Sequence, residues 1–569
     1  MFLVKEKRKK GIYLSIAKSY RDPVTKKPKQ KKVKNIGYLE DLKKTYDDPV
    51  AHFKNVAKEM TDEFNINNGK TTVTLNLSKT MTPCCNIRKN FGYIALSQVY
   101  NKLNLNDFFI NRQASLGLNY NLNNIVKLLL YNNILFADSE AHAFARKNRF
   151  FEKMDFKFDN ILDSFKYITR YNPQLRQWIH NQICEIYGRK HEPVFYYTTN
   201  HYFEVDQKKW KELSEDFNAP RLDPILQLGI FVDSNRLPIT YALFRRNPKD
   251  LPLFNVALKK NQNEYFIGRS IMVADNTAND YVYLYHILQT GNGYIVSQSI
   301  RNSDKNERTY ALDQEGYKPI DEGEWYKSRI ITRKIEVTDS DGHKKNKFIK
   351  EKQVIFYNST YARWATAERE NILMRGKDLI AHPSKYNRRH PKTDVHYSRS
   401  VELEQNISNG SLKKHPLSID SKKLKEEELY DGYYVLYTSE LSMDDISIIN
   451  AYKDLWEVEI AFQMNDKYFE GRPDEVSWSD HLSSKCAILY LSLVVTRILE
   501  LDCENSFTSQ NIVSSLKKSN CILIEDNLYL IDYYDKVLEL IGTNFGLNFA
   551  KKYRTLQNIK SLISASKKD

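Results

Sequence analysis

The spacing of apolar residues changes along the chain, and each change predicts a different kind of element. Residues 10–38 alternate apolar and polar positions on both sides of a Lys- and Pro-containing turn, which predicts a β-hairpin. A connector with short helical pieces follows over 40–80. From about 88 to 190 apolar residues recur every three or four positions, which predicts a bundle of helices.

Strands are predicted from residue 193 onwards, because aromatic and β-branched residues become frequent. The elements follow in the order β-β-β-α-β, which suits an α+β or α/β core built on a mixed sheet. They comprise a strand at 194–205, a hairpin at 222–244 that turns at Ser234-Asn235, a strand at 270–276, a helix at 280–290 and a strand at 293–300.

The last 270 or so residues divide into a charged, β-rich part and a helical part. Residues 301–440 contain short alternating runs, a hairpin-like turn at Ser340-Asp341-Gly342 and a basic, helical stretch around 360–400. From 443 to the end the pattern predicts helices, the first of them from Asp444 to Phe469.

Length and charge add the first functional information. The chain has 569 residues, enough for three or four structural units, and carries a formal net charge of +15. Residues 1–36 hold thirteen Lys and Arg, Lys9 and Lys10 among them, against two acidic residues. Such a surplus favours nucleic acid as a partner, although a basic terminal segment can equally be a solvated arm.

Several classes of protein are disfavoured by what the sequence lacks. The six cysteines show no zinc-ligand spacing and no disulfide framework, which fits a reducing cytoplasm. The N-terminus has no apolar core of signal-peptide length, and the apolar run 487–499 is interrupted by Arg497 and reads as a buried helix. A cytoplasmic protein without a membrane segment is expected.

Two acidic residues are candidates for chemistry. Asp275 ends an apolar strand, where a carboxylate can bind a metal ion or simply cap the next turn. Glu459 shares a helical stripe with Ile448, Tyr452, Leu455 and Phe462, so its carboxylate should be partly buried. A buried carboxylate needs a metal ion or an ion pair, and the sequence leaves both open.

Four stretches together resemble a known family. They are FYYTTNHYFEV, LGIFVDSNRLPITYALFRRNPKD, IMVADN, and the helix with Tyr452, Trp456, Val458 and Glu459, which is followed by Arg472-Pro473. Their order and spacing are similar to those of bacterial insertion-sequence transposases of the DDE class, in the subgroup with a β-rich insertion between the second Asp and the Glu.

The resemblance implies an α+β fold with a ribonuclease-H-like mixed-sheet core, which the β-rich insertion interrupts, between an N-terminal helical domain and C-terminal helices. The implied division is a basic N-terminal hairpin and connector (1–75), a helical DNA-binding domain (76–190), the first part of the core (191–300), the insertion (301–440), and the Glu-bearing helix with the rest of the core and the C-terminal helices (441–569).

The resemblance also implies three acids that hold two Mg²⁺ or Mn²⁺ ions, with Asp275 as the second acid and Glu459 as the third. The first-acid position is Tyr197, and a phenol is a poor replacement for a carboxylate. Glu204 or Asp206, further along the same stretch, is a candidate substitute.

A second departure concerns DNA contact, because Asp466 stands where the family has a Lys, with Lys467 beside it. The implied function is that of a transposase that binds the terminal inverted repeats and target DNA as a homodimer, at the bacterial nucleoid, and cuts and joins DNA. The alternatives are a catalytically dead or domesticated DNA-binding remnant and, further off, another nuclease. The expected DNA-binding residues are Tyr452, Lys467, Arg472, Arg388, Arg389, Lys9 and Lys10.

Overall fold

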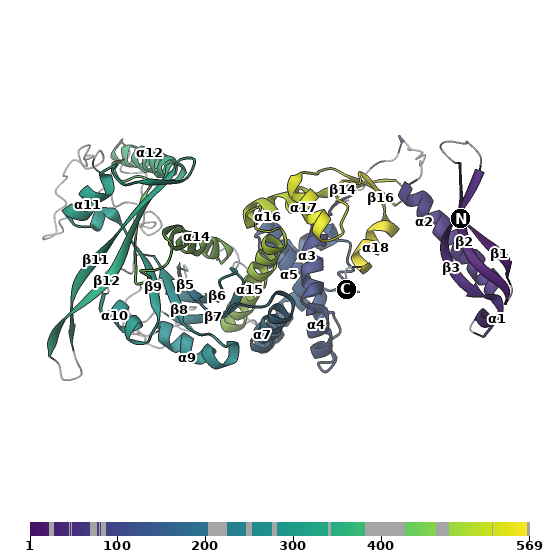
Figure 1. The fold of residues 1–569 in the computed structure, drawn as a ribbon, viewed down its shortest axis with the longest axis horizontal. Helices are drawn as coiled ribbons and strands as arrows, with labels where there is room; N and C mark the ends of the chain where they lie inside the picture. The colour runs from purple at the N-terminus through teal and green to yellow at the C-terminus, as the bar shows by residue number, and fades with distance from the viewer. Residues whose placement is uncertain are drawn as a thin grey trace.

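A computed structural model of the chain shows an elongated arrangement of two sheets at opposite ends with helices between them (Figure 1). It describes residues 1–8, 10–21, 28–44, 46, 48–68, 77–78, 80, 87–202, 225–245, 253–275, 281–338, 343–381, 426, 428–462, 477–525 and 527–565.

The N-terminal sheet has three antiparallel strands in the order β1-β2-β3. The predicted hairpin is present as β2 and β3, and the first residues add a strand that the sequence pattern did not single out. The elements are β1 (Phe2–Arg8), β2 (Gly11–Arg21), β3 (Pro28–Tyr38), α1 (Leu39–Leu42) and α2 (Pro49–Asn68).

The helical region predicted from about 88 to 190 is confirmed, apart from the short strand β4 at its start. Its longest helix, α7, continues through Pro173 and ends at Gly188, which has the left-handed φ of 65° that commonly terminates helices. The elements are β4 (Arg88–Asn90), α3 (Tyr93–Lys102), α4 (Leu105–Gln113), α5 (Leu122–Phe136), α6 (Glu140–Ala145), the 3₁₀ turn η1 (Lys147–Arg149) and α7 (Phe158–Tyr187).

The central sheet begins with the strands predicted between 193 and 300. They lie in the order β7-β6-β5-β8-β9, with β6 antiparallel to both of its neighbours, β5 and β7, and with β5, β8 and β9 parallel. The sheet is therefore mixed, as expected. The elements are β5 (Val194–Tyr202), β6 (Ile225–Val232), β7 (Pro238–Arg245), α9 (Leu253–Tyr265), β8 (Ser270–Ala274), α10 (Tyr281–Gln289) and β9 (Gly293–Gln298).

The β-rich segment after residue 300 extends this same sheet. Its last strand, β13, pairs antiparallel with β9, and the order continues outward as β12, β11 and β10. One nine-stranded sheet thus joins core and insertion, and the long β11–β12 hairpin projects from its end (Figure 1). The elements are the 3₁₀ turn η2 (Ile300–Asn302), α11 (Lys305–Leu312), β10 (Lys318–Asp321), β11 (Glu324–Thr338), β12 (Lys344–Asn358), α12 (Ser359–Ala381) and β13 (Tyr433–Thr438).

Because successive side chains along a strand point to opposite faces, the central sheet packs against a different hydrophobic core on each face. Val194 and Tyr196 of β5 pack with apolar residues of α9 and α10, whereas Tyr197 packs with residues of α14 (Asp445–Ala461) and α15 (Trp478–Asp502) on the opposite face. The helix that carries Glu459 therefore covers the face of the sheet toward which position 197 points.

The expectation of a purely helical C-terminus is wrong. Three strands, β14, β15 and β16, form a four-stranded sheet with β4, in the order β16-β15-β14-β4. They are only three to six residues long, and such short apolar runs carry too few positions to distinguish period two from helical spacing. The elements are α16 (Ser509–Lys518), β14 (Asn520–Glu525), β15 (Leu528–Ile531), α17 (Lys536–Asn544), β16 (Tyr553–Thr555) and α18 (Leu556–Ala565).

Within the described part of the chain, one helix is long and apolar enough to cross a membrane by length and composition, Ser479–Asp502. Its most apolar window is 89% buried inside the protein, and Figure 1 shows α15 packed among the other helices. The predicted buried helix around Arg497 is thus confirmed as a core helix.

Candidate active site

Asp275 follows the last residue of β8 and is exposed, so its carboxylate lies at the carboxyl edge of the sheet. Two hydroxyl groups donate to its Oδ1, that of Ser297 on the neighbouring strand β9 and that of Tyr452 on α14, the latter at 3.0 Å. The strand end and these two hydroxyl groups therefore hold the carboxylate in a fixed position.

Tyr452 links the sheet edge to the helix above it. Its side chain is buried, and it packs edge-to-face against Trp456 with ring centroids 5.2 Å apart. Burial, followed by the negative charge of Asp275, raises the pKa of the phenol far above its ordinary value. The hydroxyl therefore stays protonated and donates to the carboxylate.

Glu459 lies two turns after Tyr452 on α14, on the same side of the helix. Asp444 caps the start of this helix, because its carboxylate accepts a hydrogen bond from the Ser447 amide at 3.0 Å. Burial first, and then the charge of Asp275, raises the pKa of Glu459 to about 7. The two predicted acids are thus close enough for their charges to interact across the sheet–helix interface.

A cavity of about 630 Å³ opens beside Asp275. Aromatic side chains line much of it, from α12, β13 and α14, and an ion pair between Arg301 and Asp431 at 3.1 Å lies at its wall. Trp364 is 63% exposed on this wall.

Tyr197, the first-acid position, does not contribute a ligand beside Asp275. It pairs with Val273, two residues before the aspartate, which places it about 6–7 Å further back along the strands. Its side chain is 2% exposed, and burial raises its pKa well above the ordinary value. The charges that act on this phenol are those of Asp454, Arg497, Arg236 and Glu457 rather than those of the acid pair.

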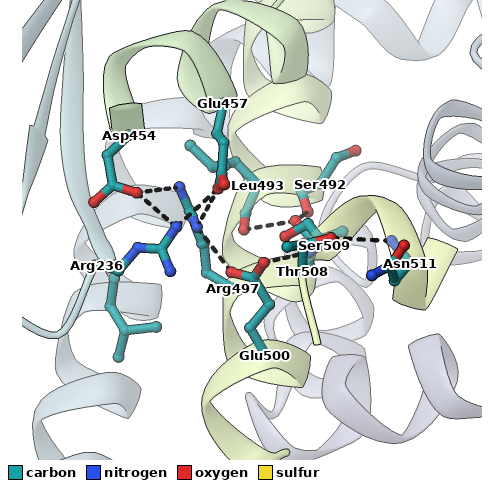
Figure 2. Close-up of polar contacts among 12 residues, drawn as sticks. Arg236, Asp454, Glu457, Ser492, Leu493, Arg497, Glu500, Thr508, Ser509 and Asn511 are labelled. Atoms are coloured by element: carbon teal, nitrogen blue, oxygen red, sulfur yellow. Dashed lines mark hydrogen bonds and ion pairs between the residues drawn. The ribbon is translucent and has the colours of Figure 1, made fainter. Parts of the chain in front are cut away.

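Those charges belong to a buried ion cluster, which we call the α14–α15 cluster (Figure 2). Arg497 on α15 contacts Glu457 at 2.7 Å, Glu500 at 2.8 Å and Asp454 at 3.5 Å. Arg236, in the β6–β7 turn, contacts Asp454 at 2.5 Å and Glu457 at 2.8 Å. The cluster joins the turn, the Glu459 helix and the core helix in one network.

Burial dominates the electrostatics of the α14–α15 cluster. The Arg497 side chain is 4% exposed. Desolvation raises the pKa values of Asp454 and Glu457 despite the opposing attraction of Arg236 and Arg497. Sequence reasoning missed this cluster, although Arg497 inside an apolar run was a signal that a buried cation needed acidic partners.

The remaining predicted residues contribute little to the described site. Lys10, one of the expected DNA-binding residues, is exposed in the β1–β2 turn. Among the described residues no group of three or more His, Cys, Asp or Glu is placed to hold a metal ion. Outside the described residues lie Lys9, Glu204, Asp206, Arg388, Arg389, Asp466, Lys467 and Arg472.

The chain thus combines a basic N-terminal sheet with a mixed central sheet, at whose edge Asp275 lies near the helix that carries Glu459. Residues 3–71 match the family described as the N-terminal domain of IS1634 family transposases. This match confirms the resemblance to insertion-sequence transposases.

Two further comparisons add less. No curated protein matches the sequence significantly. A solved structure titled "Cryo-EM structure of piggyBac transposase synaptic complex with hairpin DNA (SNHP)" aligns with 9% identity and a TM-score of 0.31, over 84% of this chain and 85% of that chain. At that TM-score the alignment says nothing about a shared fold.

Proposed function

We propose that this chain is a DDE-class transposase with two of the three catalytic acids, Asp275 and Glu459, and with impaired DNA cutting. The observation that carries the proposal is the convergence of these two acids at the end of β8 under α14, with Tyr452 hydrogen-bonded to Asp275. The order β7-β6-β5-β8-β9, with α9 and α10 on one face and α14 on the other, supports a ribonuclease-H-like core.

The donor set fits a hard divalent cation. Asp275 and Glu459 offer carboxylate oxygens, the ligands that Mg²⁺ and Mn²⁺ prefer. The elevated pKa of Glu459 reflects burial and a facing negative charge, an arrangement that a bound cation relieves. A metal ion bound by these two acids would activate a water molecule or a 3′-hydroxyl for attack on a DNA phosphodiester.

The protein's own residues then orient the reaction. Tyr452 and Ser297 donate to one oxygen of Asp275 and so fix the carboxylate at the end of β8, where Asp275 and Glu459 would hold the ion. The aromatic cavity beside Asp275 offers flat faces on which the bases next to the cut strand can stack. In this proposal two copies of the chain work together, each on one terminal inverted repeat, at the bacterial nucleoid.

A second function, a DNA-binding remnant without chemistry, is favoured by the surroundings of Tyr197. A carboxylate at this position would point into the α14–α15 cluster, where Asp454 and Glu457 already pair with both arginines. The fold has therefore adapted to an aromatic residue where the resembling family has its first acid.

Cleavage of a labelled duplex that carries the element's own ends, in Mg²⁺ and in Mn²⁺, tests the proposal. We expect slow nicking by the wild type, loss of nicking in Glu459→Gln and unchanged nicking in Glu185→Gln, a matched control that is exposed on α7. Nicking that survives Glu459→Gln would sink the assignment of the site. End-specific binding without nicking by any variant would establish the DNA-binding remnant.

A further inference from the structure

A second cavity, of about 600 Å³, lies in the helical region. Six asparagines line it, together with one ion pair, Asp107, Ser564, two further lysines and three apolar side chains. We call it the asparagine cavity; the asparagines are Asn101, Asn104, Asn106, Asn121, Asn123 and Asn124. They lie on α3, α4 and α5 or directly before α4 and α5, and the packing of these helices brings them to one place.

Three of these amides form a continuous hydrogen-bonded chain. The Tyr100 hydroxyl donates to Asn123 Oδ1 at 2.7 Å, Asn123 Nδ2 donates to Asn106 Oδ1 at 2.9 Å, and Asn106 in turn donates to Asn101. Since a primary amide has two N–H donors and an oxygen with two lone pairs, Asn106 and Asn123 each retain donor and acceptor capacity. The chain fixes their orientation and so pre-organises a polar edge.

The side chains of the other three asparagines make hydrogen bonds within the protein, and these bonds account for them without a ligand. Asn121 caps α5, because its side-chain oxygen accepts a hydrogen bond from the backbone N–H of Asn124 at 2.9 Å. The Asn124 side chain donates to the Lys153 carbonyl at 2.8 Å, and the Asn104 side chain donates to that of Gln182 at 2.7 Å. The inference therefore depends on the Asn106–Asn123 edge and not on the number of asparagines.

A buried ion pair completes the polar lining. Lys127 contacts Glu152 Oε1 at 3.0 Å, and the two side chains are 2% and 7% exposed. Within the described structure Glu152 Oε2 is buried without a hydrogen-bond partner. An acceptor in that state is costly, so a small shift that brings a ligand N–H to this oxygen would be favourable.

Apolar and cationic groups flank the polar edge. Phe151 and Ile563 supply a flat and an aliphatic surface, and Lys153 and Lys560 are exposed at the same cavity. A nucleotide has the matching parts, namely a planar edge of donors and acceptors that side-chain amides read, a face that stacks on an aromatic ring, and an anionic phosphate. A sugar lacks the flat face and the phosphate.

We infer that the asparagine cavity binds one unpaired nucleotide, with the base edge at Asn106 and Asn123, the base face against Phe151 and the phosphate toward Lys153 and Lys560. The nucleotide comes either from single-stranded DNA or from a free nucleoside monophosphate. This site is separate from Asp275 and Glu459, and the inference stands whether or not the chain cuts DNA.

Fluorescence anisotropy with short labelled dA, dC and dT homopolymers, at salt high enough to suppress contacts by surface lysines, tests the inference. We expect a preference among the bases that falls about tenfold in Asn106→Ala and in Asn123→Ala. The control Asn181→Ala, which removes an exposed side-chain amide on α7, should keep the wild-type preference among the bases. Thermal unfolding checks that each variant is folded. Asn123→Ala removes a buried partner of Tyr100, so if this variant fails to fold, the base preference of Asn106→Ala alone tests the inference.

Competition separates the two sources. Displacement of the homopolymer by dAMP, dCMP or dTMP at comparable concentration identifies a mononucleotide site, whereas displacement only by unlabelled single strand identifies a DNA site. Both results support the cavity. Equal binding of all three homopolymers, or a base preference that survives both asparagine variants, would overturn the inference.

Discussion

At the scale of single residues, Tyr197 shows how one substitution can alter chemistry and packing together. The Tyr197→Asp change would restore the acid of the resembling family, yet it removes a buried ring and buries a new carboxylate in the α14–α15 cluster, whose acids already pair with its arginines. We expect a loss of about 3–5 kcal/mol of unfolding free energy. Urea denaturation measures it.

Tyr197→Phe is the matched control for that change, because it keeps the ring and should cost about 1 kcal/mol or less. If Tyr197→Asp unfolds at the wild-type urea concentration, the side chain does not face the buried charges as described.

His180 provides a residue-scale prediction on pH. Burial, together with the charges of Arg189 and His191, lowers its pKa from 6.5 to about 3. Between pH 3 and pH 6.5, His180 is protonated in the unfolded chain but not in the folded chain. The free energy of unfolding therefore falls as the pH is lowered from 6.5 toward 3. His180→Gln should flatten the dependence of the melting temperature on pH in this window.

His286→Gln serves as the control for His180, because His286 is exposed on α10. An unchanged slope of melting temperature against pH in His180→Gln would show that this histidine is free to take up a proton in the folded protein.

At the scale of elements, the α14–α15 cluster holds the Glu459 helix against the core helix. Replacing Arg497 by Met leaves three carboxylates, of Asp454, Glu457 and Glu500, with less compensating charge. Breaking such a buried pair costs about 3–5 kcal/mol, and denaturation should show a loss of that size.

Arg236→Met tests the same cluster from a position where the side chain is 35% exposed, so its effect should be smaller. Equal stability of the Arg497 variant and the wild type would mean that packing, not the cluster, holds α14 on α15.

The sequence predicts the secondary structure correctly where the periodic pattern of apolar residues is long. Helices α5 and α7 and the β6–β7 hairpin follow from spacing alone, because each has ten or more residues or a clear turn. The joining of β13 to β9 was not readable, because strand partners far apart in sequence are chosen by tertiary packing. The strands β14, β15 and β16 were not predicted, because they are too short to show a period of two.

The candidate site was readable only in part. Glu459 emerged as an acid on an apolar stripe and Asp275 as an acid at a strand end, and the structure brings their charges together. The hydroxyls of Ser297 and Tyr452 on Asp275, and the cluster around Tyr197, depend on contacts between distant segments. Local spacing carries no information about such contacts.

At the scale of the whole molecule, charge is concentrated in the N-terminal sheet at one end of the chain (Figure 1). Lys31 and Lys34 are exposed on β3. If they contact DNA phosphates, each Lys→Gln change should weaken binding and reduce the slope of log K against log salt by about 0.9. Lys259→Gln, exposed on α9, should leave the slope unchanged.

The most direct test of the account is calorimetric titration of the protein with Mn²⁺, since the central claim is that Asp275 and Glu459 form one cation site without Tyr197. We predict binding that is lost in Asp275→Asn and in Glu459→Gln and retained in Tyr197→Phe. Binding that survives both acid replacements, or that disappears in Tyr197→Phe while the protein remains folded, would contradict the account.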